Sequence, residues 1–176
     1  MLTKSVSLFL ALLSTAFAQP QMIGFRQLQQ YLPKGDVDGF RHGKLSGESS
    51  SMMGFSTSWA QADYVDSTNN STASVKITDM VNLPSYMSMS PSITGDVDRE
   101  TRTGYEKTVM YQGVRVLENF DTLSHQAKLQ TLVARRFLIE ITGTNMSGVR
   151  SLYAILDMTD FAGLEKLSPS QGGQGD

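Results

Sequence analysis

The clearest pattern in the chain is a strict alternation of apolar and polar residues over positions 72–78. Val75 and Ile77 fall on apolar positions, and hydroxyl or lysine side chains occupy the positions between them. This two-residue period is typical of a strand with one buried and one exposed face in an antiparallel sheet. The preceding run, 55–65, is rich in aromatic and β-branched residues and predicts a partner strand that forms a hairpin with it.

Four further segments show strand patterns and are joined by short polar turns: 105–111, 114–120, 129–134 and 137–142. By contrast, 34–51 is rich in glycine, serine and charge and predicts an exposed loop with one weak strand around Phe40. Residues 96–103 predict a charged loop. The pattern therefore indicates about six strands.

Helical spacing of apolar residues occurs near both ends of the chain. Residues 24–32 form one amphipathic stripe, which Pro33 ends. Residues 149–159 form a second stripe, and 161–167 predict a short helix after it. Because the strands are grouped between the helices, the predicted class is α+β, with N- and C-terminal helices packed on one face of an antiparallel sheet.

The first part of the chain, 1–18, has the three regions of a cleavable signal peptide. Lys4 supplies a positive charge, 6–13 are apolar, and Ala16 and Ala18 are the small residues before a cleavage site. The apolar stretch is shorter than the roughly 20 residues that a membrane-spanning helix needs, and no later segment approaches that length. We therefore expect a protein of the periplasm or the extracellular space, with no transmembrane segment in the mature chain. Its parts would be a single α+β domain over 19–167 and a disordered tail over 168–176.

The composition removes several classes of function. The chain has 15 lysine and arginine residues against 17 aspartate and glutamate residues, so its formal net charge is −2 and it has no broad basic field for nucleic acid. It contains no cysteine, which excludes disulfides, thiolate metal sites and thiol nucleophiles. Its length of 176 residues, 40% of them hydrophobic, is enough for one domain with a core of its own.

The second half of the chain resembles a known group of proteins. The residues that carry the likeness are Gly104-Tyr105-Glu106-Lys107, Gln112-Gly113, Glu118-Asn119-Phe120-Asp121 and the run from Leu132 to Gly143. They are similar to uncharacterised exported bacterial proteins with a PsbP-like domain, and the likeness extends over about residues 55–167. The resemblance implies an α+β fold and an accessory or binding role. It brings no ligand motif with it, so no ligand residues are carried over.

Motifs of enzymes are missing from the sequence. There is no Gly-x-Ser-x-Gly elbow, no HExxH zinc motif and no phosphate-binding glycine loop. His42 and His125 are the only histidines, and both fall in polar segments, where a solvated side chain explains them as well as a catalytic base does. The aspartate pairs that begin at Asp36 and Asp96 lack the glutamate that ends an EF-hand loop and indicate turns. A hydrolase that uses either histidine remains a weaker alternative.

Methionine is frequent, with ten residues in the chain. Met52, Met53, Met87 and Met89 are candidate metal ligands, because thioether sulfur selects Cu(I) and the chain has no cysteine to offer. A periplasmic copper-binding protein is therefore the main alternative function. In the other interpretation these side chains fill gaps beneath loops, and the protein needs no cofactor.

Aromatic residues indicate where a ligand would bind. Five of them are candidates for a small apolar pocket between the sheet and a neighbouring loop: Trp59, Tyr86, Tyr105, Tyr111 and Phe120. Packing in the core or at an edge explains the same residues. Arg135 and Arg136 fall at a predicted hairpin tip, where they would pair with an acidic partner or guard an exposed turn. The sequence thus predicts an exported accessory protein without catalytic activity that binds a partner protein or a small apolar ligand.

Overall fold

The computed structural model describes residues 21–52, 55–81 and 95–168. In this part of the chain, eight strands form one antiparallel sheet with the order β1-β2-β3-β8-β7-β6-β5-β4. The strands are β1 (Arg41–Met52), β2 (Phe55–Asp66), β3 (Ser71–Asp79), β4 (Asp98–Thr101), β5 (Gly104–Tyr111), β6 (Val114–Asp121), β7 (Gln126–Val133) and β8 (Phe137–Thr144). The helical elements are α1 (Phe25–Leu28), the 3-10 turn η1 (Gln29–Tyr31), α4 (Arg150–Asp157) and α5 (Phe161–Leu167).

The predicted fold class, a PsbP-like α+β arrangement with about six strands, is wrong. The described chain is mostly sheet, and its three α-helices are only four to eight residues long. The two strands that the sequence did not predict are β1 and β4, which are the two edges of the sheet. Side chains of an edge strand need not be buried, and every residue of β4 and most of β1 are exposed. No apolar alternation therefore marks these strands, and backbone hydrogen bonds to one neighbouring strand hold each of them in the sheet.

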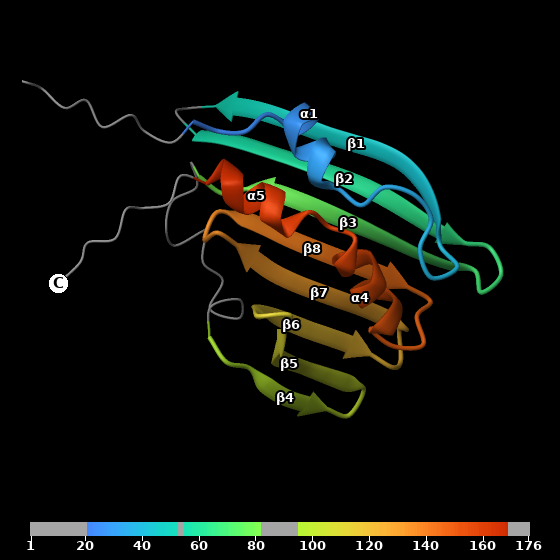
Figure 1. Ribbon diagram of the computed structural model, residues 1–176. Coiled ribbons are helices and arrows are strands. Elements are labelled where there is room, and N and C mark those ends of the chain that lie inside the picture. Colours follow the sequence, from blue (N-terminus) through green and yellow to red (C-terminus); the bar gives the residue numbers. More distant parts are fainter. Residues whose placement is uncertain (1–20, 53–54, 82–94, 169–176) are drawn as a thin grey trace, which may run out of the picture.

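The core lies between the sheet and the helices, which Figure 1 shows together on one face. The alternation over 72–78 is confirmed, because Ala73, Val75 and Ile77 are buried here and pair in register with β8. The hairpin of β2 and β3 is confirmed as well. The largest side chains with no exposed surface are Tyr64, Phe137, Leu28, Ile77, Ile139, Ile141, Leu152, Ile155 and Leu164. We call this side of the sheet the helix face.

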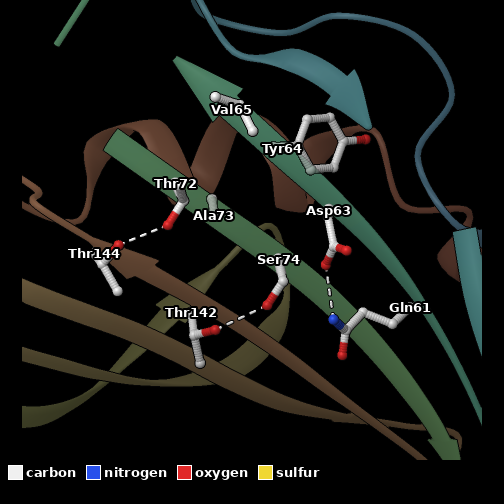
Figure 2. Close-up of a pocket in the computed structure, with 9 residues that line it drawn as sticks. All are labelled: Gln61, Asp63, Tyr64, Val65, Thr72, Ala73, Ser74, Thr142 and Thr144. Carbon is white, nitrogen blue, oxygen red and sulfur yellow. Dashed lines mark hydrogen bonds between the residues drawn. The ribbon is translucent and has the colours of Figure 1, made fainter. Parts of the chain in front are cut away.

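The opposite side, the open face, is polar along its centre. Two hydroxyl pairs join β3 to β8 there: Thr72 with Thr144 at 2.6 Å and Ser74 with Thr142 at 3.0 Å (Figure 2). The next pair in the same register is Lys76 with Glu140. Hydroxyl and charged side chains in this position are compatible with water, so this face needs no covering layer.

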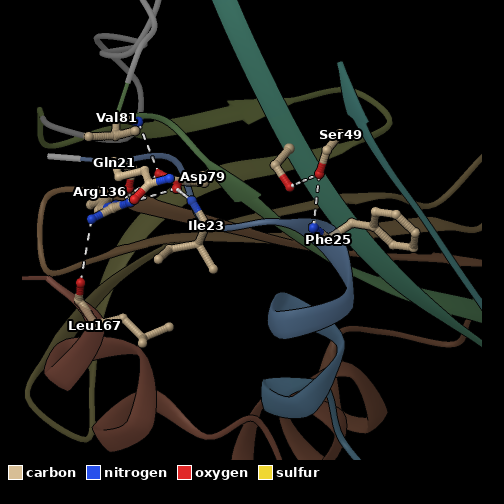
Figure 3. Close-up of polar contacts among 9 residues, drawn as sticks. Gln21, Ile23, Phe25, Ser49, Asp79, Val81, Arg136 and Leu167 are labelled. Atoms are coloured by element: carbon tan, nitrogen blue, oxygen red, sulfur yellow. Dashed lines mark hydrogen bonds and ion pairs between the residues drawn. The ribbon is translucent and has the colours of Figure 1, made fainter. Parts of the chain in front are cut away.

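A buried ion pair holds the sheet to both ends of the described chain. The Arg136 guanidinium donates to both carboxylate oxygens of Asp79, from Nε at 2.9 Å and from Nη2 at 2.7 Å (Figure 3). It also donates to the carbonyl oxygens of Gln21 and Leu167, and the Asp79 carboxylate accepts from the backbone N–H of Ile23 at 2.7 Å. The expectation that Arg136 is exposed at a hairpin tip, or free for an acidic partner, is therefore wrong. Its partner is an aspartate of the same chain, whereas Arg135 is exposed.

Candidate functional site

The helices leave part of the helix face uncovered. In Figure 1, α1, α4 and α5 lie over β1, β2, β3, β8 and β7, and the described helices do not extend over β4, β5 and β6. Side chains of these three strands and of the outer flank of α4 gather here. We call this region the aromatic–acidic surface; it consists of Asp98, Glu100, Tyr105, Lys107, Tyr111, Glu118, Phe120, Tyr153 and Asp157.

Strand register brings three of the predicted ligand-binding aromatics to this surface. Tyr105 of β5 pairs with Phe120 of β6, and their rings are 6.4 Å apart. Tyr111 lies at the other end of β5, where its ring packs against that of Tyr153 with centroids 4.4 Å apart. The Tyr111 hydroxyl donates to the Asp157 carboxylate at 2.8 Å, which ties β5 to the last turn of α4. All three predicted residues keep part of their surface exposed, so they offer aromatic area to a partner.

Glu118 lies at the centre of the surface and is almost completely buried, with 6% of its surface exposed. The Tyr153 hydroxyl donates to one of its carboxylate oxygens, and the Lys107 ammonium is 3.5 Å from the other. The same ammonium lies 5.0 Å from the centre of the Tyr105 ring. An ammonium between an aromatic face and a carboxylate is a favourable arrangement for a cation, and here the cation is the protein's own lysine.

Three further carboxylates share this surface with the lysine and Glu118. The register of β4 on β5 places Asp98 opposite Lys107 and Glu100 opposite Tyr105, so both carboxylates lie on the helix face. With Glu118, which is paired with Lys107, and Asp157, which lies at Tyr111 toward the other end of β5, the surface carries four carboxylates. The surface therefore has an excess of negative charge that favours a cationic partner.

The tyrosines of the surface are held in their protonated form. Burial raises the pKa of Tyr153, and the hydrogen bond to Glu118 and the charge of Glu118 raise it further. Burial also raises the pKa of Tyr105, with a further contribution from the same carboxylate, and the hydrogen bond to Asp157 raises the pKa of Tyr111. At neutral pH all three hydroxyls are therefore hydrogen-bond donors, not phenolates that would act as bases.

Two other predicted aromatics do not join this group. Trp59 lies on the open face, where it pairs with Thr78 and has the Lys76 ammonium 5.1 Å from its ring centre. Tyr86 lies outside the described residues. Trp59 therefore lies apart from the other three aromatics, because it is on the opposite face of the sheet and on β2, which β3, β8 and β7 separate from β6.

The sequence did not single out Glu118 and Tyr153, although both carried a signal. Val116 and Phe120 alternate with the polar residues of their strand, and Glu118 lies between them on the buried side. A carboxylate on the apolar side of a strand is unusual and indicates a paired charge. Tyr153 lies next to the apolar stripe of its helix, where a tyrosine can bury its ring and present its hydroxyl at the rim.

The candidate metal and catalytic residues are not gathered into a centre. Met52 ends β1 with 74% of its surface exposed, while Met53, Met87 and Met89 lie outside the described residues. His42 is in β1, and not in a loop as its sequence context suggested, with its ring edge-on to Tyr64 at 5.3 Å. His125 directly precedes β7, and its ring lies 3.3 Å from the Met146 carbonyl oxygen. Three strands, β2, β3 and β8, lie between β1 and β7 and separate the two histidines. Within residues 21–52, 55–81 and 95–168, we find no group of three or more acidic or histidine side chains that would hold a metal ion.

Two shallow hollows also occur on the surface. The larger, of about 360 Å³, is on the open face over β2, β3 and β8 and is lined by Gln61, Asp63 and the hydroxyl pairs described above (Figure 2). The smaller, of about 270 Å³, borders Tyr105, Phe120 and the ends of β4 to β6. Both are open to solvent, unlike the enclosed sites that small apolar ligands occupy. No helix in the described part of the chain is long and apolar enough to cross a membrane.

Comparison of the chain with protein-family models, with curated proteins and with solved structures finds no match in any of the three.

Proposed function

We propose that the chain is an exported binding protein without catalytic activity, and that it holds a partner protein through the aromatic–acidic surface. The observation that carries this proposal is the buried Glu118 carboxylate, which two tyrosines and a lysine surround at the edge of exposed aromatic rings. Tyrosine is enriched among the residues that dominate binding energy at protein interfaces. A rim of charged residues around such a centre supplies specificity and a faster association rate.

A partner protein accounts for this site better than a small apolar ligand does. The apolar core between the sheet and the helices is buried, and the two hollows are open to solvent. A small apolar ligand gains most of its affinity from enclosure, which neither hollow supplies. A protein surface gains affinity on a shallow site because it covers a larger area.

The charge of the site favours a basic segment of that partner. Asp98 and Glu100 are exposed carboxylates on the short edge strand β4, and Asp157 lies across the surface from them on α4. Lys107 already occupies one position between an aromatic ring and a carboxylate. Lysine or arginine side chains of the partner would bind between the remaining carboxylates and the rings of Tyr105 and Tyr111 in the same manner.

The test uses short fluorescent peptides of equal length, one set rich in lysine and arginine and the other rich in glutamate. We expect the full chain to bind the basic set, with an affinity that falls as the salt concentration rises. The double substitution Asp98→Lys with Glu100→Lys should weaken this binding about tenfold or more, because it reverses two exposed charges that the peptide would face. The matched control is Glu165→Lys, an exposed charge reversal on α5.

Two results would contradict the proposal. Equal binding of basic and acidic peptides at low salt would remove the charge argument. If the double substitution on β4 leaves the binding of the basic peptides unchanged, the peptides contact another part of the molecule. Export is tested separately, by determining the N-terminal residue of the protein recovered from the envelope or the medium; cleavage of the signal after Ala18 gives Gln19.

A further inference from the structure

The two edges of the sheet differ greatly in length. β4 has four residues, whereas β1 has 12 and pairs only with β2 among the described strands. A strand averages about five or six residues, so β1 is a long edge with backbone donors and acceptors that no neighbouring strand of the described chain pairs. The Ser46 carbonyl oxygen accepts a hydrogen bond from the Gln29 side chain at 3.2 Å, which a pairing strand would have to replace. Such an edge is a template for pairing with a further strand.

The charges of β1 are arranged symmetrically about its middle. Lys44 and Glu48 lie two residues before and two residues after Ser46. If two β1 strands pair antiparallel about a twofold axis at Ser46, Lys44 of each copy is opposite Glu48 of the other. Each dimer then contains this pair of opposite charges twice, in the cross-strand positions where such pairs are stabilising. Lys44 lies at a bulge of β1, where the register shifts between His42 and Leu45, and the long lysine side chain tolerates the irregularity.

The same alignment covers an exposed apolar side chain. Leu45 has 48% of its surface exposed and points to the helix face, as does Gly47, since both pair with buried alanines of β2. A side chain on Gly47 would meet the Phe25 ring, which lies directly over this glycine. In the twofold alignment Leu45 of one copy is opposite Gly47 of the other and contacts the Phe25 ring beside it.

We propose that two copies of this chain associate through β1, antiparallel about a twofold axis at Ser46, to form one sheet that is continuous across the dimer. Both β4 edges, and therefore both aromatic–acidic surfaces, then lie at the outer ends of this sheet, because each surface is at the edge opposite β1. The dimer would present two binding surfaces to a partner. The proposed dimer rests on residues of β1 and does not depend on the proposed function of the aromatic–acidic surface.

The test is a charge-swap series measured by sedimentation equilibrium over a range of protein concentrations. We expect a concentration-dependent dimer for the unchanged chain. Lys44→Glu alone and Glu48→Lys alone should each weaken the dimer about tenfold or more, since each replaces two attractive pairs by two repulsive ones. The double substitution Lys44→Glu with Glu48→Lys restores both pairs in reversed order, so it should restore the dimer.

The matched controls are Glu165→Lys and Lys166→Glu, exposed charge reversals on α5, which should leave the dimer unchanged. Circular dichroism verifies that each variant is folded. A chain that is monomeric at every concentration overturns the proposal. So does a dimer that both single substitutions leave intact, or one that the double substitution fails to restore, since either result shows that β1 is not paired in this alignment.

Discussion

Substitution of Arg136 by methionine is the most informative test of how the fold is held together. The side chain has 7% of its surface exposed, and its partner Asp79 has none. Methionine keeps an apolar stem like that of arginine but removes the guanidinium. The Asp79 carboxylate would then keep two backbone donors, from Ile23 at 2.7 Å and Val81 at 3.0 Å, and would lose both hydrogen bonds to a cation.

The expected loss of stability follows from this geometry. Removing one partner of a buried ion pair lowers the free energy of unfolding by about 3 to 5 kcal/mol, because the other charge stays buried without compensation. A domain of this size has a total stability of about 5 to 15 kcal/mol. At about 2 to 4 °C for each kcal/mol, the melting temperature should fall by roughly 10 °C. Urea unfolding followed by circular dichroism measures the free energy directly.

Two further variants make the reasoning refutable. Arg135→Met changes the exposed neighbour and should lower the stability by less than about 0.5 kcal/mol. Asp79→Asn combined with Arg136→Met removes the uncompensated charge, so the double variant should be more stable than Arg136→Met alone. Equal small effects of Arg136→Met and Arg135→Met would show that the buried ion pair does not stabilise the fold as described. Simple addition of the effects of Asp79→Asn and Arg136→Met would show the same.

Three other outcomes are expected. Burial and, to a smaller extent, the charge of Asp36 raise the pKa of Tyr64 from 10.0 to about 12. The stability that the protonated Tyr64 contributes is therefore present below pH 10 and is lost as the pH rises toward 12. Unfolding measured over this range should show the loss, and the Tyr64→Phe variant should not show this pH dependence. Tyr153→Phe leaves the buried Glu118 carboxylate without its hydroxyl donor and should lower the stability by about 1 to 3 kcal/mol, as denaturant unfolding would show. Ala134 and Arg135 both have positive φ values, of 52° and 53°, in the turn between β7 and β8. Replacing them by Asn and Gly should raise the melting temperature by a few degrees, equivalent to about 1 kcal/mol. An unchanged or lower melting temperature would show that the turn is not strained.

The parts of the fold that the sequence predicted are those in which burial and backbone geometry agree. In β3 and β8, alternate residues enter the core, so the two-residue period is visible in the amino-acid sequence itself. β1 and β4 lack this period because edge strands are stabilised by hydrogen bonds to one neighbour and not by buried side chains. The predicted class was wrong mainly because of these two strands, which turned a supposed mixed fold into a wide sheet with small helices.

The candidate site was predictable in its aromatic part. Tyr105, Tyr111 and Phe120 lie on strands whose period was visible, and strand register then placed them on one face. The contribution of Tyr153 comes from an element more than thirty positions further along the chain than Glu118, as the separation of the two residues in their hydrogen bond shows. No local pattern contains a contact of this kind, because it depends on where α4 docks on the sheet.

The buried ion pair of Arg136 and Asp79 brings distant parts of the chain together. One guanidinium contacts the carbonyl oxygens of Gln21 and Leu167, so the two ends of the folded region lie next to each other and the polypeptide nearly closes on itself. A short peptide between these ends should make a circularly permuted protein, with new termini opened at the exposed turn at Arg102, between β4 and β5. In such a permutant the order of the strands along the gene changes while every neighbour in the sheet stays the same.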